Sequence, residues 1–147
     1  MSRRPALADD EGSTLPLVIF FGMLGLIVVL LVTAATSLYL EKKRLFTIAD
    51  GASLVGAEAF ELDAVALTPD GPRPVLESAD IAVAAADYLA GNPVAELEGL
   101  TLEQAFTADG RSATVTVSSV WHPPVVTMFV PEGLRVEATA TARSVFG

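Results

Sequence analysis

Residue types that commonly carry catalysis are scarce in this sequence of 147 residues. It has no cysteine and a single histidine, His122, which stands before two prolines. Without cysteine there is no disulfide, no thiolate zinc site and no cysteine nucleophile. A lone histidine beside prolines is typical of a turn, and it cannot complete a site that needs two histidines. We therefore expect no enzyme, no metal site and no cofactor.

The distribution of charged residues and glycines also argues against several classes of ligand. The pair Glu96 and Glu98 is typical of a solvated acidic surface, and no Walker-type loop or dinucleotide-binding glycine pattern is present. The net charge is −9, and the last lysine is Lys43, so the chain beyond it is acidic. An acidic domain repels phosphate backbones. We expect neither nucleic acid nor a small-molecule substrate as a partner.

The stretch Leu15–Leu40 has no charged residue and the length of one membrane span. At about 1.5 Å per residue it covers roughly 39 Å, against a hydrocarbon core of about 30 Å. The charged collar (Glu41–Arg44) follows and suits the lipid headgroup region. We expect a polar leader over 1–12, a transmembrane helix with its collar over 13–44, and an extracytoplasmic α+β domain over 45–147.

The helix is expected to continue beyond the collar, because apolar residues recur at alternating spacings of three and four. Gly51 and Gly56 lower its helix propensity without forbidding it. Two interpretations are open: this seam packs on the chain's own C-terminal domain, or it packs on neighbouring subunits. The seam residues are Leu45, Ile48, Ala52, Val55, Ala59 and Leu62.

The rest of the chain predicts one further helix and a small antiparallel sheet. After a turn-rich break at 68–74, a helix should begin near Ser78 and end at Gly91–Pro93. Alternation of apolar and polar residues predicts about three strands, with a bulge near Ser118–Ser119. The fold class is therefore α+β, with a long N-terminal transmembrane helix that extends into this domain. The strands are expected around 100–106, with Leu100, Leu102 and Phe106 on one face, and around 113–117 and 134–142.

The connection between the last two strands is unusually apolar. It follows His122-Pro123-Pro124 and precedes Pro131-Glu132-Gly133. A connection of this composition folds back on the core, touches the membrane or contacts a partner, and the sequence leaves all three open. Its apolar residues are Val125, Val126, Met128, Phe129 and Val130.

The segment Tyr39–Ala57, together with Gly12-Ser13 and the apolar span, resembles the TadE/TadG-like proteins of the tight-adherence (Tad, Flp) pilus system. That family combines a glycine-serine start, a hydrophobic helix, an aromatic and basic collar, and a leucine-x-x-alanine-aspartate-alanine-alanine run. The closing segment 136–143 is also similar to the last strand of these proteins. The matching places in the run are held by Leu45, Ala49, Asp50, Ala52 and Leu54.

This resemblance implies a pilin-like domain and a pseudopilin or minor-pilin-like subunit. Its implied partners are the membrane and pilus assembly proteins or pilin subunits. Members of this type can be cut by a prepilin peptidase after the glycine, which implies processing between Gly12 and Ser13. The sequence departs from the pattern at Leu17, where pilin-type sites usually carry glutamate, and near Ala34, where TadG-type helices often carry aspartate.

Two other interpretations are open. The N-terminal segment could be an ordinary signal peptide cut near Ala34, which would give a secreted protein, although its apolar core exceeds the usual 7–15 residues or so. The chain could also be an anchored subunit of a different envelope complex.

The basic residues do not decide the topology. Arg3 and Arg4 precede the span and Lys42–Arg44 follow it, so the positive-inside rule slightly favours a cytoplasmic C-terminal domain. A short leader is normally retained inside the cell, and the resemblance implies an external domain. We therefore expect residues 45–147 outside the cytoplasm of a single-pass membrane protein.

Overall fold

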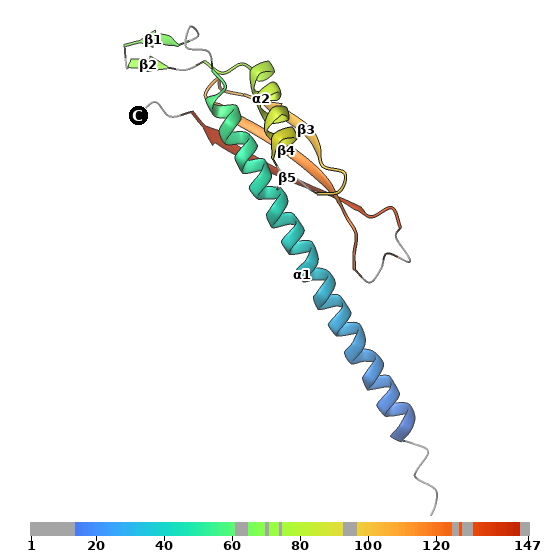
Figure 1. Cartoon of the computed structure of the whole chain (residues 1–147). Coiled ribbons are helices and arrows are strands. Elements are labelled where there is room, and N and C mark those ends of the chain that lie inside the picture. Colours follow the sequence, from blue (N-terminus) through green and yellow to red (C-terminus); the bar gives the residue numbers. More distant parts are fainter. Residues whose placement is uncertain are drawn as a thin grey trace, which may run out of the picture.

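A computed structural model describes residues 14–60, 65–69, 71–73, 75–92, 97–124, 127 and 131–144. Figure 1 shows α1 as a long rod, with the other elements gathered around its C-terminal half. We call α1 from Leu45 onward, α2 and the three-stranded sheet the head. In chain order the elements are α1 (Thr14–Glu58), β1 (Ala66–Thr68), β2 (Gly71–Arg73), α2 (Ser78–Gly91), β3 (Thr101–Phe106), β4 (Ser112–Trp121) and β5 (Leu134–Arg143).

The α+β fold class is confirmed, with one long helix, one further helix and a three-stranded antiparallel sheet in the order β3-β4-β5. β4 and β5 pair without interruption from Ser112 opposite Arg143 to Trp121 opposite Leu134. The break expected after Thr68 contains a small additional hairpin of β1 and β2. Its turn requires Gly71, whose φ of +110° is strained for residues with a side chain.

The irregularity of the main sheet lies on β3, so the expected bulge near Ser118–Ser119 is wrong. Pairing jumps from Leu102 to Gln104 on β3, which makes Glu103 an extra residue, while β4 and β5 stay in register through both serines. Ser118 is buried although it lies on the face opposite the core, because its hydroxyl donates to Glu103 (Oγ to Oε1, 2.5 Å).

The bulge also changes which side chains of β3 face the core. An extra residue reverses the alternation beyond it. Leu102 and Ala105 therefore pack against the core, while Phe106, which was expected on the same face as Leu102, is exposed.

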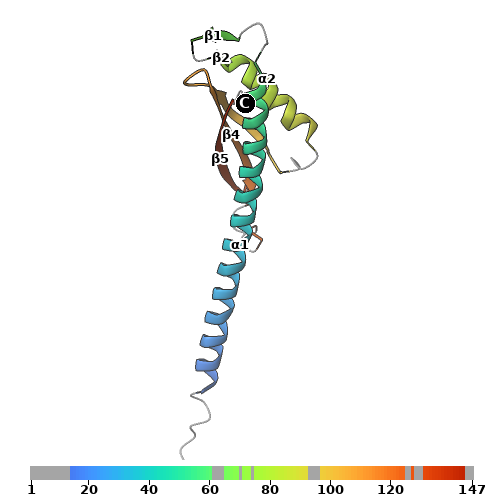
Figure 2. The same ribbon diagram turned by 90° about the vertical axis from the view of Figure 1, so that its left-hand side faces the viewer.

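Both helices cover one face of the sheet (Figure 2). α1 packs on β4, β5 and α2, and α2 also packs on β3. Small residues dominate this core, so the helices lie close to the strands. The opposite face carries threonine pairs across β4 and β5 and is open to solvent. The buried residues that the strands contribute to the core are Ala113, Val115, Val117, Ala138, Ala140 and Ala142.

The hairpin between β3 and β4 is held by the carboxylate of Asp109. It accepts hydrogen bonds from the backbone N–H of Arg111 (2.9 Å) and from the N–H and hydroxyl of Ser112 (2.7 and 3.1 Å). The two backbone N–H groups are the main reason that the pKa of Asp109 is lowered from 3.8 to about 2. The charged carboxylate therefore stabilises the folded state, and this contribution is lost as the pH falls from 3.8 to about 2.

We expect Asp109→Ala to melt at a lower temperature than the unchanged chain at neutral pH, because the hydrogen bonds from Arg111 and Ser112 are lost. Asp109→Asn should lie between the two, since one amide oxygen can still accept the backbone bonds. The deficit of Asp109→Asn should shrink as the pH falls toward about 2. Thermal melting across this pH range checks the prediction, and a deficit that stays constant with pH would contradict it.

Candidate membrane anchor and packing faces of α1

The N-terminal half of α1 is apolar on every side and is exposed at most of its positions in the part of the chain that the structure describes. It belongs to the one helix among the described residues that is long and apolar enough to cross a membrane, and its most apolar stretch is not buried against the rest of the chain. An unpaired helix that is apolar all round is typical of a membrane span. This half therefore has the properties of a single-pass anchor.

Two polar side chains in this half are satisfied within the helix. The hydroxyls of Thr33 and Thr36 donate to the carbonyl oxygens of Val29 and Val32, both at 2.8 Å. Such bonds remove the penalty of an unpaired hydroxyl in lipid. Pro16 lies in the first turn, where its missing N–H has no intrahelical partner to lose.

The collar turns one of its side chains toward the sheet. Glu41 is half-buried and accepts a hydrogen bond from the hydroxyl of Ser119 on β4 (3.2 Å). Lys42 and Lys43 are exposed. Arg44 borders an open hollow of about 270 Å³ between α1 and the end of β4. The collar therefore contacts the sheet on one side and leaves its lysines free on the other.

A second contact joins the end of β4 to the helix below the collar. The indole N–H of Trp121 donates to the hydroxyl of Ser37 (3.2 Å), and Trp121 is only 8% exposed. Sequence reasoning missed both contacts, because it ended the alternation of β4 at Val117. The odd-numbered residues in fact face α1 as far as Trp121, with Ser119 among them.

Above the collar, the buried face of α1 differs in part from the expected seam. Leu45, Ile48 and Ala52 are buried, whereas Val55 is 37% exposed and Ala59 lies beyond the end of the helix. Leu62 lies outside the described residues. A straight helix has about 3.6 residues per turn, so a strict heptad pattern drifts away from the contact face. The residues that complete the buried face are Ala49, Ser53, Gly56 and Ala57.

Two glycines of α1 permit its close approach to α2. A Cβ atom on Gly56 would lie 2.9 Å from Cγ2 of Ile81 and 3.3 Å from Cβ of Ala113. A Cβ atom on Gly51 would overlap the ring of Tyr88. Sequence reasoning treated these glycines only as weak helix formers. The sequence feature that could have identified this role is the position of both glycines among small residues, on a helix expected to pack against other elements.

The side of α1 that faces away from the sheet carries an exposed apolar stripe. Tyr39, Phe46 and Leu54 are each more than half exposed. They recur at intervals of seven and eight, which places them on one side of the helix. Exposed Lys43 and Asp50 lie between them on the same side. Aromatic and apolar side chains in a row on a helix are typical of a packing surface rather than a solvated face.

Two further sets of expected site residues cannot be placed. Gly12 and Ser13, the expected processing site, lie outside the described residues. The same is true of the apolar residues of the β4–β5 connection, Val125, Val126, Met128, Phe129 and Val130.

The residues that the structure describes contain no group of three potential metal ligands. His122 pairs with Glu98 at 3.3 Å at the end of β4. On the outer face, Arg135 lies 2.8 Å from Glu103. The hydroxyl of Ser118 and then Arg135 lower the pKa of Glu103. Both ion pairs join neighbouring segments at the sheet.

Comparison with known proteins finds a family model that matches the first helix. Residues 12–59 match the sequence model of the family described as "Tad: Putative Flp pilus-assembly TadE/G-like". The match covers about a third of the chain, namely the apolar span, the collar and the buried face of α1. It confirms the resemblance found in the sequence. No curated protein and no solved structure matches the chain.

Proposed function

We infer the role of this chain from its identity as a TadE/TadG-like protein of the Tad pilus system and from the two halves of α1. We propose that it is a membrane-anchored pseudopilin or minor-pilin-like subunit that takes part in assembly of a Tad pilus. Its head lies outside the cytoplasm. The proposal assigns no catalytic step to the chain, and its partners are other pilin or pilus assembly proteins.

One observation carries this proposal. A single unbroken helix is exposed at most positions of its apolar N-terminal half and is buried on one face by its own head over Leu45–Ala57. A helix that only anchored a globular domain could end at the membrane surface. Here the anchor and the central helix of the head are the same element, so a force or a rotation applied to one is transmitted to the other.

The exposed apolar half also offers positions for close packing with other helices. Within lipid no hydrophobic drive holds helices together, so association relies on small residues. Gly22 and Gly25 have nothing within 4 Å of an added Cβ atom, and Ala34 and Ala35 lie further along the span. Above the collar, water makes apolar burial favourable again, and the exposed stripe of Tyr39, Phe46 and Leu54 is the surface that a neighbouring subunit could cover.

The proposal predicts that deletion of this chain abolishes surface pili in a bacterium that assembles them with it, and that the full chain restores them. In intact spheroplasts of the complemented strain, externally added protease should digest the head while a cytoplasmic marker stays intact. Electron microscopy of the cell surface and immunoblotting of the head measure the two results.

The alternatives predict different outcomes of the same experiment. Normal pili without the chain would favour an anchored subunit of another envelope complex. Digestion only after lysis would reverse the topology and exclude the pilus role. Mass spectrometry of the native N-terminus separates an intact chain, a cut after Gly12, and a signal-peptide cut near Ala34 that would release a secreted protein.

A further inference from the structure

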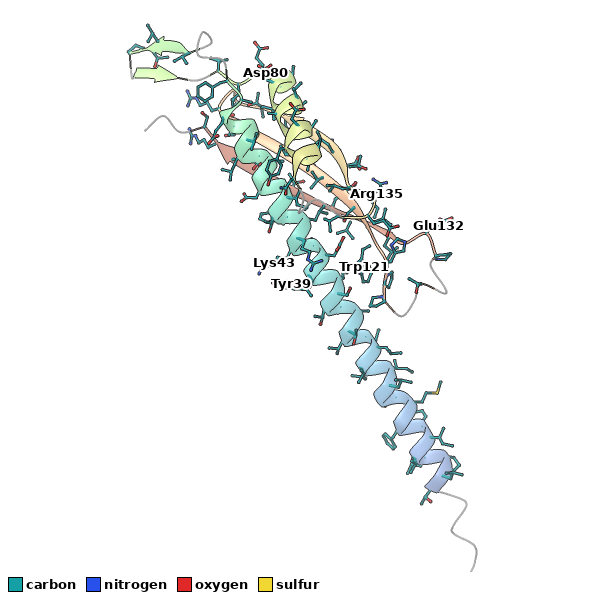
Figure 3. The ribbon with its side chains drawn as sticks, viewed as in Figure 1. Tyr39, Lys43, Asp80, Trp121, Glu132 and Arg135 are labelled. Atoms are coloured by element: carbon teal, nitrogen blue, oxygen red, sulfur yellow. The ribbon has the colours of Figure 1, made fainter. Side chains whose placement is uncertain are left out.

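Strand β4 runs down alongside α1 into the region of the expected membrane surface. Near its start, Ala113 lies against Gly56, and near its end Ser119 bonds Glu41 and Trp121 bonds Ser37. Figure 3 shows Trp121 beside α1 at about the level of Tyr39, which lies on the other side of the helix. Among the described residues, the head therefore contacts the helix below the collar, at Ser37 within the uncharged stretch Leu15–Leu40.

The length of this stretch places Ser37 near the lipid headgroups. A hydrocarbon core of about 30 Å needs only about 20 helical residues. A core that begins near Leu15 ends near Ala34, and the remaining turns up to the collar then lie in the polar interface. Ser37 is one turn above that boundary, so Trp121 reaches the same level although it belongs to the head.

The side chains around this level suit an interface between lipid and water. Tyr39 is exposed and has a polar tip on an apolar ring, which is typical of the aromatic belts of membrane proteins. Exposed Lys42 and Lys43 lie about one turn higher, where phosphate groups of lipids can meet them. On the head, Pro124 and Leu134 are exposed beside the end of β4. Apolar groups thus lie near the level of Ser37, with basic groups about one turn above them.

We propose that the Trp121 end of the sheet rests in the headgroup region of the bilayer, and that the hydrogen bond from Trp121 to Ser37 holds the head at that depth. The head is then fixed on the membrane surface rather than free to bend away from it above the collar. The inference rests on membrane anchoring by α1 but does not depend on the pilus role.

Trp121 is the only tryptophan of the chain, so its fluorescence tests this placement without a label. The full chain is reconstituted into phosphatidylcholine vesicles whose acyl chains carry bromines at a shallow, a middle or a deep position. Since brominated chains quench only nearby rings, the loss of fluorescence should be largest for the shallow bromines and decrease with depth. Equal fluorescence in brominated and plain vesicles would overturn the placement.

Flotation of the same vesicles keeps this inference distinct from the proposed function. If the chain fails to float with the lipid, the anchor itself is wrong. If it floats and shallow bromines leave Trp121 unquenched, the anchor stands and the placement of the head is overturned.

A variant of Ser37 tests the role of the hydrogen bond. Ser37→Ala should reduce shallow quenching and increase quenching by acrylamide from the water, whereas Ser37→Thr, which keeps a hydroxyl, should behave like the unchanged chain. Thr36→Ala is the matched control, because the Thr36 hydroxyl bonds only its own helix. Quenching that is unchanged in Ser37→Ala would overturn the holding role of the bond.

Discussion

The double variant Leu26→Arg/Val29→Arg is expected to lose stable association with the membrane. Each arginine at the centre of a span costs about 2.5–3.5 kcal/mol on insertion scales. The leucine, isoleucine, valine and phenylalanine residues of this span each favour insertion by about 0.3–0.6 kcal/mol, so together they outweigh one arginine but are nearly balanced by two. Either single variant should therefore remain largely in the membrane fraction.

The structure makes this prediction specific to the membrane. Leu26 and Val29 are exposed and contact no part of the head, so their replacement leaves the core unchanged. Leu54→Arg is a matched control, because it makes the same kind of change on the exposed side of the same helix above the collar. Fractionation and carbonate extraction measure the result. A double variant that stays in the membrane fraction would show that this half of α1 is not the anchor.

Much of the architecture was predictable, because it follows from simple periodicities. The uncharged stretch predicts the span, and the strict alternation over 134–142 predicts β5. The three-stranded sheet and α2 also followed from alternation and from turn residues such as those at 68–74 and Gly91–Pro93. These signals lie within short segments, so no knowledge of distant contacts was needed to interpret them.

What could not be predicted depends on contacts between distant segments. Ser119 was interpreted as an interruption of β4, because its partner Glu41 lies far away in the sequence. The bulge at Glu103 is stabilised by Ser118 and Arg135, which belong to two other strands. Gly51 and Gly56 appeared unfavourable for a helix until α2 was seen against them. Each of these residues departs from the local pattern of its strand or helix, and in each case a contact with a distant segment of the chain explains the departure.

The two interpretations of the seam can now be separated, and Ala52→Leu is expected to destabilise the isolated protein. Ala52 is completely buried between α1 and its own head, so a larger side chain must displace packed neighbours. Such overpacking typically costs about 1–3 kcal/mol. For a domain of this size, each kcal/mol lowers the melting temperature by about 4–8 °C. Thermal melting of the full chain in detergent micelles measures the shift.

Two substitutions on the exposed side of α1 complete the comparison. Thr47→Leu introduces the same leucine side chain at an exposed position of α1, so its melting temperature should match that of the unchanged chain. Phe46→Ser should also leave the melting temperature unchanged, because Phe46 is exposed, but it should reduce pilus formation if a neighbouring subunit covers the stripe. If instead Ala52→Leu melts normally and only Ala52→Leu prevents assembly, the buried face of α1 is a subunit interface. The packing of the head on α1 described above would then be wrong.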